Sequence, residues 1–545
     1  MKKNIFTFII CLITLSGYAQ TVEYIGPRGS IHDDPANGIY VAPNGNDQTG
    51  NGSIGAPFKS ISTALGKATS GATIILRSGT YSDGNEVRVR TPNITIKSRK
   101  GEWAFINLPF PANIQDQNDG RSAVRFDPNA SGCKLQSLDI SGGFYAVCTE
   151  TKWDWGQADR SGASNIIIED CKLHDSRYEV VKVKPLCNNI TVRFCEIYNP
   201  GRAELGTTKW KNGEAHGEAI DNVNSHNMKV QNCYMHDLNI GLYAKGGATD
   251  ILFENNRIEN CLGAGIAVAF DTSPDFFDLT VNPNYYECIR TIVRNNLIIN
   301  TGWEGIGFYA SKDAEVYNNT VVNALCEGTI KYHSPIYFGL SYQDWDPKAG
   351  RPANVNPSFH HNIVSQPSTS KNLMIDIRYS NDLGGMSALS GKPTMHDNCY
   401  YIAGKSATFS DNRPGSILSN ASLAAWKTHI SGENGTVEVN PSLNADYVTT
   451  NTQCTGMGIQ FALKINPTAN DTPTLFPETV ASIHNGTLFI ANESAETVQA
   501  FSTAGVLLFH FQKAEGKVGY PINLSKGTPI IVCGSSGWTK KLFCP

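Results

Sequence analysis

Seven short segments of this chain share one pattern of apolar and polar positions. Apolar residues alternate with polar ones, the run ends at an Asn or a Cys, and a second short apolar run follows. A period of two predicts a β-strand, because successive side chains of a strand point to opposite faces. The ends of the seven segments are Cys171, Cys195, Cys233, Asn256, Asn296, Asn319 and Asn362.

These ends are separated by 24, 38, 23, 40, 23 and 43 residues, so short coils alternate with longer ones. A repeat of this length is typical of a solenoid. We therefore predict an all-β fold, a right-handed parallel β-helix, in which the Asn and Cys positions stack as a buried ladder. Cys171, Cys195 and Cys233 are interpreted as packing thiols of that ladder rather than as catalytic groups.

The longer coils carry insertions that the stack does not need. Residues 149–163, 271–287 and 341–357 follow one strand of their coils, and residues 200–217 follow another, so we expect two walls that flank one sheet. Aromatic side chains stack on sugar rings, and cations pair with carboxylates or sulfates. The wall residues predicted to bind substrate in this way are Trp153, Arg202, Lys209, Trp210, Trp345 and Arg351. The alternative is that these side chains pack on neighbouring insertions.

The strand between the walls carries an unusual set of polar residues. When the coils are aligned by their ladder positions, to within a residue, Lys184, Asn222, Lys245 and Tyr309 fall in one row with Asp221 beside it. A lysine pointing inward would be a buried, unpaired charge. We therefore expect these side chains to face outward into a groove.

This row suggests β-elimination on a uronic acid, in which a base removes the proton next to the carboxylate and the glycosidic oxygen leaves. Lys245 is the predicted base, because it sits in the middle of the row and cationic neighbours would favour its neutral amine. Lys184 or Arg202 would neutralise the carboxylate, and Tyr309 or His216 would protonate the leaving oxygen. The alternative for Lys245 is an ordinary solvated lysine.

The N-terminal part of the chain carries three characteristic runs, Ile39 to Asp47, Pro57 to Ile61 and Ile74 to Tyr81. Together they resemble the opening of secreted right-handed β-helices of the pectate-lyase superfamily, including family 9 polysaccharide lyases and chondroitinase-B-like enzymes. The resemblance covers about 45 residues closely and implies a short amphipathic helix over Ser60 to Lys67 that caps the first coils.

A calcium site is a further candidate. Glu218 and Asp221 offer carboxylate oxygens, which Ca²⁺ prefers, and no other cofactor is expected. Family 9 lyases pair a cluster of Asp residues with a Lys base, but this sequence has no matching Asp-Asp pair in the strands of the predicted groove. The paired acids of the chondroitinase-B-like enzymes are not matched in spacing either, so no ligand set is carried over.

The pattern changes near the C-terminus. Short apolar runs separated by Gly and Asn predict a small β-sandwich over residues 476–545. The strand order and the basic, apolar end, Lys540 to Phe543, resemble the C-terminal sorting domain of the Bacteroidetes type IX secretion system. The resemblance implies a partner in the secretion machinery; a carbohydrate-binding module is the alternative. Residues 20–405 would then form the β-helix, and residues 406–475 its last irregular coils and a linker.

Residues 1–19 have the three parts of a signal peptide: two lysines, an apolar stretch from Ile5 to Leu15, and small residues before a cut near Ala19. We therefore expect a secreted or cell-surface protein without a transmembrane segment. Without Lys2 and Lys3 the chain has 43 Lys and Arg against 49 Asp and Glu, a net charge of −6. That balance argues against nucleic acid as a partner.

The sequence thus predicts a secreted polysaccharide lyase whose substrate is an acidic polysaccharide. A glycoside hydrolase would need converging carboxylates, for which Asp221 with Glu218 is one weak pair. A uronate epimerase shares the first proton abstraction with a lyase. A glycan-binding or adhesin β-helix without catalysis would present the same walls.

Overall fold

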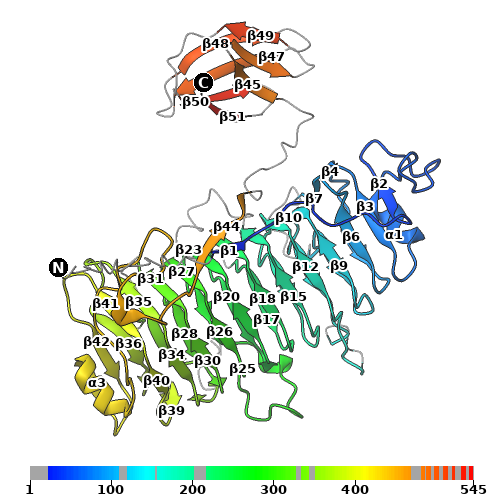
Figure 1. Cartoon of the computed structure of the whole chain (residues 1–545). Coiled ribbons are helices and arrows are strands. Elements are labelled where there is room, and N and C mark those ends of the chain that lie inside the picture. The colour runs from blue at the N-terminus through cyan, green and yellow to red at the C-terminus, as the bar shows by residue number, and fades with distance from the viewer. Residues whose placement is uncertain are drawn as a thin grey trace, which may run out of the picture.

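The computed structural model describes residues 22–109, 120–153, 156, 158–201, 217–326, 333–342 and 350–467, together with the strands between residues 480 and 543. Within these residues the chain coils into a parallel β-helix whose successive coils add short strands to three long sheets (Figure 1). The predicted all-β solenoid is confirmed.

Three long sheets form the body of the solenoid. The first sheet contains, in chain order, β2 (Ile39–Val41), β3 (Thr73–Leu76), β6 (Thr95–Ser98), β9 (Lys134–Gln136), β12 (Ile167–Glu169), β15 (Thr191–Arg193), β18 (Lys229–Gln231), β22 (Leu252–Glu254), β26 (Ile292–Arg294), β30 (Glu315–Tyr317), β34 (Ser358–His360) and β40 (Thr394–His396). The second sheet contains β4 (Gly79–Tyr81), β7 (Ala104–Leu108), β10 (Leu138–Gly142), β13 (Lys172–His174), β16 (Glu196–Tyr198), β19 (Tyr234–Leu238), β23 (Arg257–Cys261), β27 (Leu297–Thr301), β31 (Thr320–Ala324), β35 (Ile363–Gln366) and β41 (Cys399–Ile402). The third sheet contains β5 (Val87–Val89), β8 (Val124–Phe126), β11 (Val147–Thr149), β14 (Val181–Val183), β17 (Ile220–Val223), β20 (Leu242–Lys245), β24 (Ile266–Ala267), β28 (Ile306–Tyr309), β32 (Ile336–Gly339), β36 (Leu373–Ile377), β42 (Thr408–Asp411) and β43 (Leu418–Ala421).

Shorter elements complete the solenoid. A narrow sheet lies between the third and first sheets in chain order and contains β21 (Ala248–Thr249), β25 (Cys288–Ile289), β29 (Ser311–Lys312), β33 (Asn354–Val355) and β39 (Leu389–Ser390). A small hairpin is formed by β37 (Tyr379–Ser380) and β38 (Met386–Ser387). Two single turns of 3₁₀-helix are η2 (Pro274–Phe276) and η3 (Thr452–Cys454).

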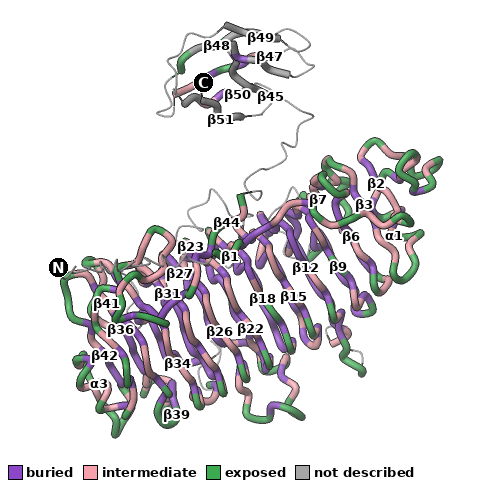
Figure 2. Tube along the Cα trace, in the orientation of Figure 1, coloured by how far each residue is buried: buried purple, intermediate pink, exposed green. Residues whose placement is uncertain are grey.

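The seven predicted repeat segments become seven consecutive strands of the first sheet, β12 to β34, and their Asn and Cys ends form the predicted buried ladder. Each ladder amide bonds to the next coil: Asn296 Nδ2 donates to Asn319 Oδ1 at 3.0 Å, and Asn319 Nδ2 donates to Asn362 Oδ1 at 3.0 Å. The ladder continues one coil further, to Asn398. Buried residues accordingly run along the coils of the solenoid (Figure 2).

The predicted N-terminal cap helix is α1 (Ile61–Lys67). It begins at Ser60, whose side chain accepts a hydrogen bond from the backbone N–H of Thr63, as an N-cap residue does. Ile61 and Ala64 face the core. At the other end of the solenoid, helix α3 (Leu423–Ile430) buries Trp426 against Phe409 of β42.

Two strands outside the coils join distant parts of the chain. Strand β1 (Val22–Ile25) pairs in parallel with β44 (Ala462–Ile465), so the segment that precedes the first coil meets the segment that follows the last one. Ile25 is fully buried there and packs with Leu297, Leu463 and their neighbours.

The C-terminal strands form two antiparallel sheets of their own, as expected for a small β-sandwich. One contains β45 (Val480–His484), β46 (Thr487–Ala491) and β49 (Val518–Pro521). The other contains β47 (Glu496–Ser502), β48 (Leu507–Lys513), β50 (Pro529–Gly534) and β51 (Thr539–Phe543). In the described part of the chain, no helix is long and apolar enough to cross a membrane.

Candidate active site

The outer face of the third sheet carries the candidate site. Along its strands, core valines and leucines alternate with polar side chains: in β14, Val181 and Val183 point into the core while Lys182 points outward. The pairing register puts Lys182, Asp221 and Tyr243 side by side on β14, β17 and β20. Three ionisable residue types therefore meet at one place on the surface of the sheet.

Asp221 lies between two lysines. Its Oδ2 atom contacts Lys182 Nζ directly and lies 3.7 Å from Lys245 Nζ, while Lys182 Nζ is also 3.5 Å from Glu179 Oε1. Burial alone would raise the pKa of Asp221, but Lys182 and Lys245 lower it overall. Likewise, burial works to lower the pKa of Lys182, and the carboxylates of Asp221 and Glu179 raise it overall.

Two glutamates, Glu179 and Glu218, complete the cluster around Asp221. Glu179 and Glu218 each lie two residues before paired positions, Val181 and Ile220, so they occupy neighbouring coils. Burial, with the nearby Glu179 and Asp221 carboxylates, raises the pKa of Glu218 to about 8. Burial also raises the pKa of Glu179. Glu218 therefore keeps its proton at neutral pH.

Tyr243 stands beside the lysine that the sequence singles out. Lys245 Nζ donates to the Tyr243 hydroxyl at 3.3 Å and lies 4.7 Å from the centre of its ring. The side chain of Lys245 remains 16% exposed, so its amine is within reach of a molecule on the sheet.

Tyr309 occupies the same place in its coil as Lys245, three residues after paired strand positions, but it belongs to a second group of side chains. Its hydroxyl donates to Glu304 Oε1 at 2.6 Å, and His333 Nδ1 lies 2.5 Å from Glu304 Oε2. Phe270 separates the two groups, at 5.6 Å from the Tyr243 ring and 5.7 Å from the Tyr309 ring. The structure therefore does not bring Tyr309 to Lys245.

Lys184 shares the row of Lys245, since it lies three residues after Val181, which pairs through Ile220 with Leu242. Its Nζ atom lies 3.0 Å from Glu150 Oε2. Asn222, by contrast, does not lie in this row as predicted, because Val223 is the residue that pairs with Lys245. It pairs with Val183 and Ala244 on the core side, is fully buried, and accepts a hydrogen bond from the backbone N–H of Ser225.

The described parts of the walls are held by contacts among their own residues. The Arg160 guanidinium lies over the Trp153 ring, and its Cζ atom is 4.2 Å from the centre of that ring. Arg351 is not a surface cation as predicted: its side chain is buried and pairs with Glu287 at 2.8 Å, beside the rings of Phe277 and Tyr285. The predicted site residues His216, Arg202, Lys209, Trp210 and Trp345 lie outside the described residues.

Asp221 and Glu218, the predicted calcium ligands, do lie in one cluster. However, the Lys182 ammonium contacts the Asp221 carboxylate and the Lys245 amine lies 3.7 Å from it, so a positive charge already stands where a cation would bind. Because like charges repel, this donor set does not fit Ca²⁺, and no step of the chemistry is derived through it.

Sequence reasoning missed Lys182, Glu179, Glu304 and His333. Lys182 had a clear signal, because a charged residue between two β-branched core residues must point outward from a strand. Glu304 and His333 had none, since Glu304 precedes β28, His333 precedes β32, and only their coil positions bring them together.

Comparisons with known proteins agree with the fold. A family model described as a right-handed β-helix region matches residues 129–339. Pectate lyase PEL9 of Emericella nidulans is 44% identical over 119 residues, which are 20% of this chain and 29% of that protein. The match therefore spans less than a third of the length of this relative.

Two solved structures align over most of the solenoid. Pectate lyase Pel9A has a TM-score of 0.40 and 14% identity, with 79% of this chain and 89% of the other covered. The GH136 lacto-N-biosidase of Eubacterium ramulus has a TM-score of 0.41 and 12% identity, with 73% and 67% covered. Likeness at this level carries no information about the site.

Proposed function

We propose that this protein is a secreted polysaccharide lyase that cleaves a uronic-acid-containing polysaccharide by β-elimination. The proposal rests chiefly on the cluster of Lys182, Lys245 and Asp221 on the outer face of the third sheet. Two amines share one ionised carboxylate there, and burial keeps Glu218 protonated at neutral pH. Because the Lys245 side chain is 16% exposed beside this carboxylate, its amine can contact a uronate bound on the sheet.

In the proposed reaction, the neutral amine of Lys245 takes the proton from the carbon next to the uronate carboxylate. The electron pair left on that carbon forms a double bond to the neighbouring carbon, whose bond to the glycosidic oxygen breaks. The departing oxygen takes a proton from the Tyr243 hydroxyl, which lies 3.3 Å from Lys245 Nζ. Lys182 supports the negative charge that develops on the carboxylate.

The stretch of similarity to pectate lyase PEL9 supports the same proposal, because that protein's name states an elimination reaction on an acidic polysaccharide. Export directed by residues 1–19, and sorting by a secretion system through residues 476–545, belong to the proposal as predictions from the sequence.

The test is ultraviolet absorbance of the unsaturated uronate, which elimination produces and hydrolysis does not. The protein is incubated with pectate, alginate, chondroitin sulfate, hyaluronan and heparin, with Ca²⁺ or EDTA. We expect absorbance to rise on one of these polymers. Lys245→Met should lower kcat/KM by about 100-fold or more, the usual range for losing a general base.

Lys229→Met is the matched control, because Lys229 is exposed on β18 of the first sheet and away from the cluster. It should leave the rate unchanged. A flat absorbance trace with every polymer, or a rate that Lys245→Met does not alter, would contradict the lyase proposal or its base.

One observation favours a second candidate, a glycoside hydrolase. Protonated Glu218 beside the Asp221 carboxylate provides an acid and a base of the kind that hydrolases use. New reducing ends without ultraviolet absorbance, abolished in Glu218→Gln, would favour it. An absence of both signals, together with binding to a polymer, would instead indicate a glycan-binding protein.

A further inference from the structure

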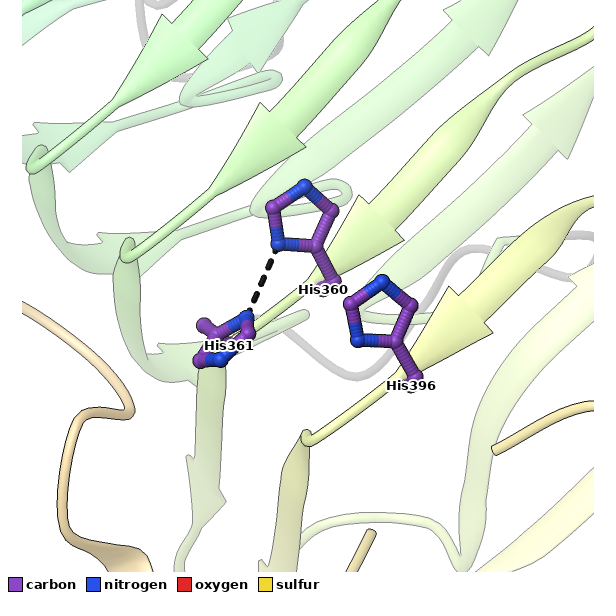
Figure 3. A group of neighbouring side chains, drawn as sticks. All are labelled: His360, His361 and His396. Carbon is purple, nitrogen blue, oxygen red and sulfur yellow. Dashed lines mark hydrogen bonds between the residues drawn. The ribbon is translucent and has the colours of Figure 1, made fainter. Parts of the chain in front are cut away.

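Three histidines gather on the first sheet, away from the candidate active site on the third. His360 ends β34 and His396 ends β40, and the two residues are direct partners in the parallel pairing of these strands. His361 follows His360 in the turn. Figure 3 shows the parallel rings of His360 and His396, with His361 beside them.

The rings are arranged so that their nitrogens lie close together. The His360 and His396 rings stack at 4.7 Å with an angle of 4° between their planes, and the His361 ring stands at 85° and 88° to them. One nitrogen from each histidine lies within 4.8 Å of one nitrogen of each of the other two.

We propose that His360, His361 and His396 form a binding site for a divalent transition-metal ion, with Zn²⁺ as the representative ion. His360 Nδ1 and His361 Nδ1 are 2.9 Å apart (Figure 3). Two nitrogens on a tetrahedral Zn²⁺, with bonds of about 2.0 Å, are about 3.3 Å apart. The His360 and His361 nitrogens are therefore close to the spacing of two ligands on one ion, and the His396 ring must turn out of its stack on His360 to join them.

An acidic residue next to the cluster can orient the imidazoles by hydrogen bonding. Asp397 Oδ2 lies 2.8 Å from His396 Nδ1 and 3.8 Å from His361 Nε2. Three imidazoles, with water in the fourth position, are a ligand set that suits Zn²⁺ and its neighbours in the first transition row, and the absence of thiolates from this set disfavours soft monovalent ions.

The surroundings allow an ion to enter. The side chains of His361 and His396 are 36% and 38% exposed, whereas His360 is only 16% exposed because its ring also stacks on Tyr317. An ion held here would tie β34 to β40 and so brace two neighbouring coils of the solenoid.

The test is metal binding by the full-length protein without a histidine tag. We expect one Zn²⁺ per chain from elemental analysis after dialysis. Co²⁺ in place of Zn²⁺ should give the visible absorption of a tetrahedral site. Zn²⁺ should also raise the temperature of thermal unfolding, because a ligand that binds only the folded state stabilises it.

His361→Ala and His396→Ala should each weaken binding by about 100-fold or more and remove the thermal shift, since each deletes one ligand. The matched control is His236→Ala: His236 Nδ1 also lies 2.8 Å from the carboxylate of the following residue, Asp237, and its ring is also stacked, on Tyr198. This control should bind Zn²⁺ as the wild type does. Stoichiometric binding that survives in both cluster variants, or no binding by the wild type, would overturn the proposal.

Discussion

Glu218 holds a proton that an exposed glutamate would lose well below neutral pH. Its pKa of about 8 in the folded state exceeds its ordinary value in the unfolded chain, so the folded state binds the proton more strongly. The resulting stability is complete at low pH and disappears as the pH rises towards 8. Between pH 5 and pH 8, the free energy of unfolding should therefore fall by about 1 to 4 kcal/mol on account of this residue.

Glu218→Gln should remove that part of the pH dependence, because an amide stays neutral throughout. Urea denaturation at pH 5 and pH 8 measures it, as the difference between wild type and variant at each pH. Asp382→Asn is the control, since Asp382 is exposed and lies away from the cluster. If Glu218→Gln and the wild type lose the same stability between the two pH values, Glu218 is ionised in the folded protein.

Single-residue placement is also where prediction from sequence reached its limit. The alignment of coils put Lys184, Lys245 and Tyr309 at equivalent positions, as the structure does, but it put Asn222 where Val223 belongs. In a strand, a shift of one residue moves a side chain from the outer face to the core. Arg351 was misplaced for another reason: its partner, Glu287, is 64 residues away and no local pattern connects them.

At the level of elements, the Asn ladder explains why the coils could be predicted from the sequence. Asn319 Nδ2 donates to the carbonyl oxygens of Val293 and Tyr317 and to Asn362 Oδ1, and its own Oδ1 accepts from Asn296. A buried amide with this many partners admits few substitutes, so the same residue recurs coil after coil. The contacts between insertions follow no repeat, which is why the walls were predicted less well than the coils.

Asn319→Ala should lower the free energy of unfolding by about 3 to 5 kcal/mol, because it leaves several buried backbone and side-chain groups without partners. Chemical denaturation measures this loss. Asn300→Gly is the control: Asn300 bonds to Asn260 and Asn323 in a similar ladder on the surface, where water can replace the lost partners, and glycine adopts its φ of 55° without strain. The free energy of unfolding should fall by about 1 kcal/mol in this control. Equal losses in the two variants would show that the buried ladder contributes no more stability than the surface one.

For the whole molecule, the pairing of β1 with β44 joins residues that are far apart in the chain. Solenoids can unfold coil by coil, because each coil contacts only its neighbours. Here Ile25 is buried against Leu297, Leu463 and nearby apolar residues, so the segments that flank the solenoid are fixed to the middle of the stack. We therefore expect β1 to unfold together with the solenoid.

Ile25→Ala should lower the denaturant midpoint of the main unfolding transition, with a loss of about 2 to 4 kcal/mol for the deleted side chain. Tyr24→Ala, at a residue that is 51% exposed, should change it little. Hydrogen exchange would detect the opposite outcome, local opening of β1. If Ile25→Ala exposes only the amides of residues 22–25 and leaves the midpoint unchanged, β1 opens independently.

The pairing of β1 with β44 also suggests that the chain could begin at a different coil. Val22 and Ala462 are direct neighbours in the parallel β1–β44 pair, so a linker from residue 467 would have to return along the pair by about 17 Å to reach residue 22, which about a dozen residues can do. New chain ends could then be opened in an exposed segment such as residues 279–281, where no long strand is interrupted. A circularly permuted solenoid of this kind should retain every coil contact of the original, although its first residue would lie in the middle of the stack.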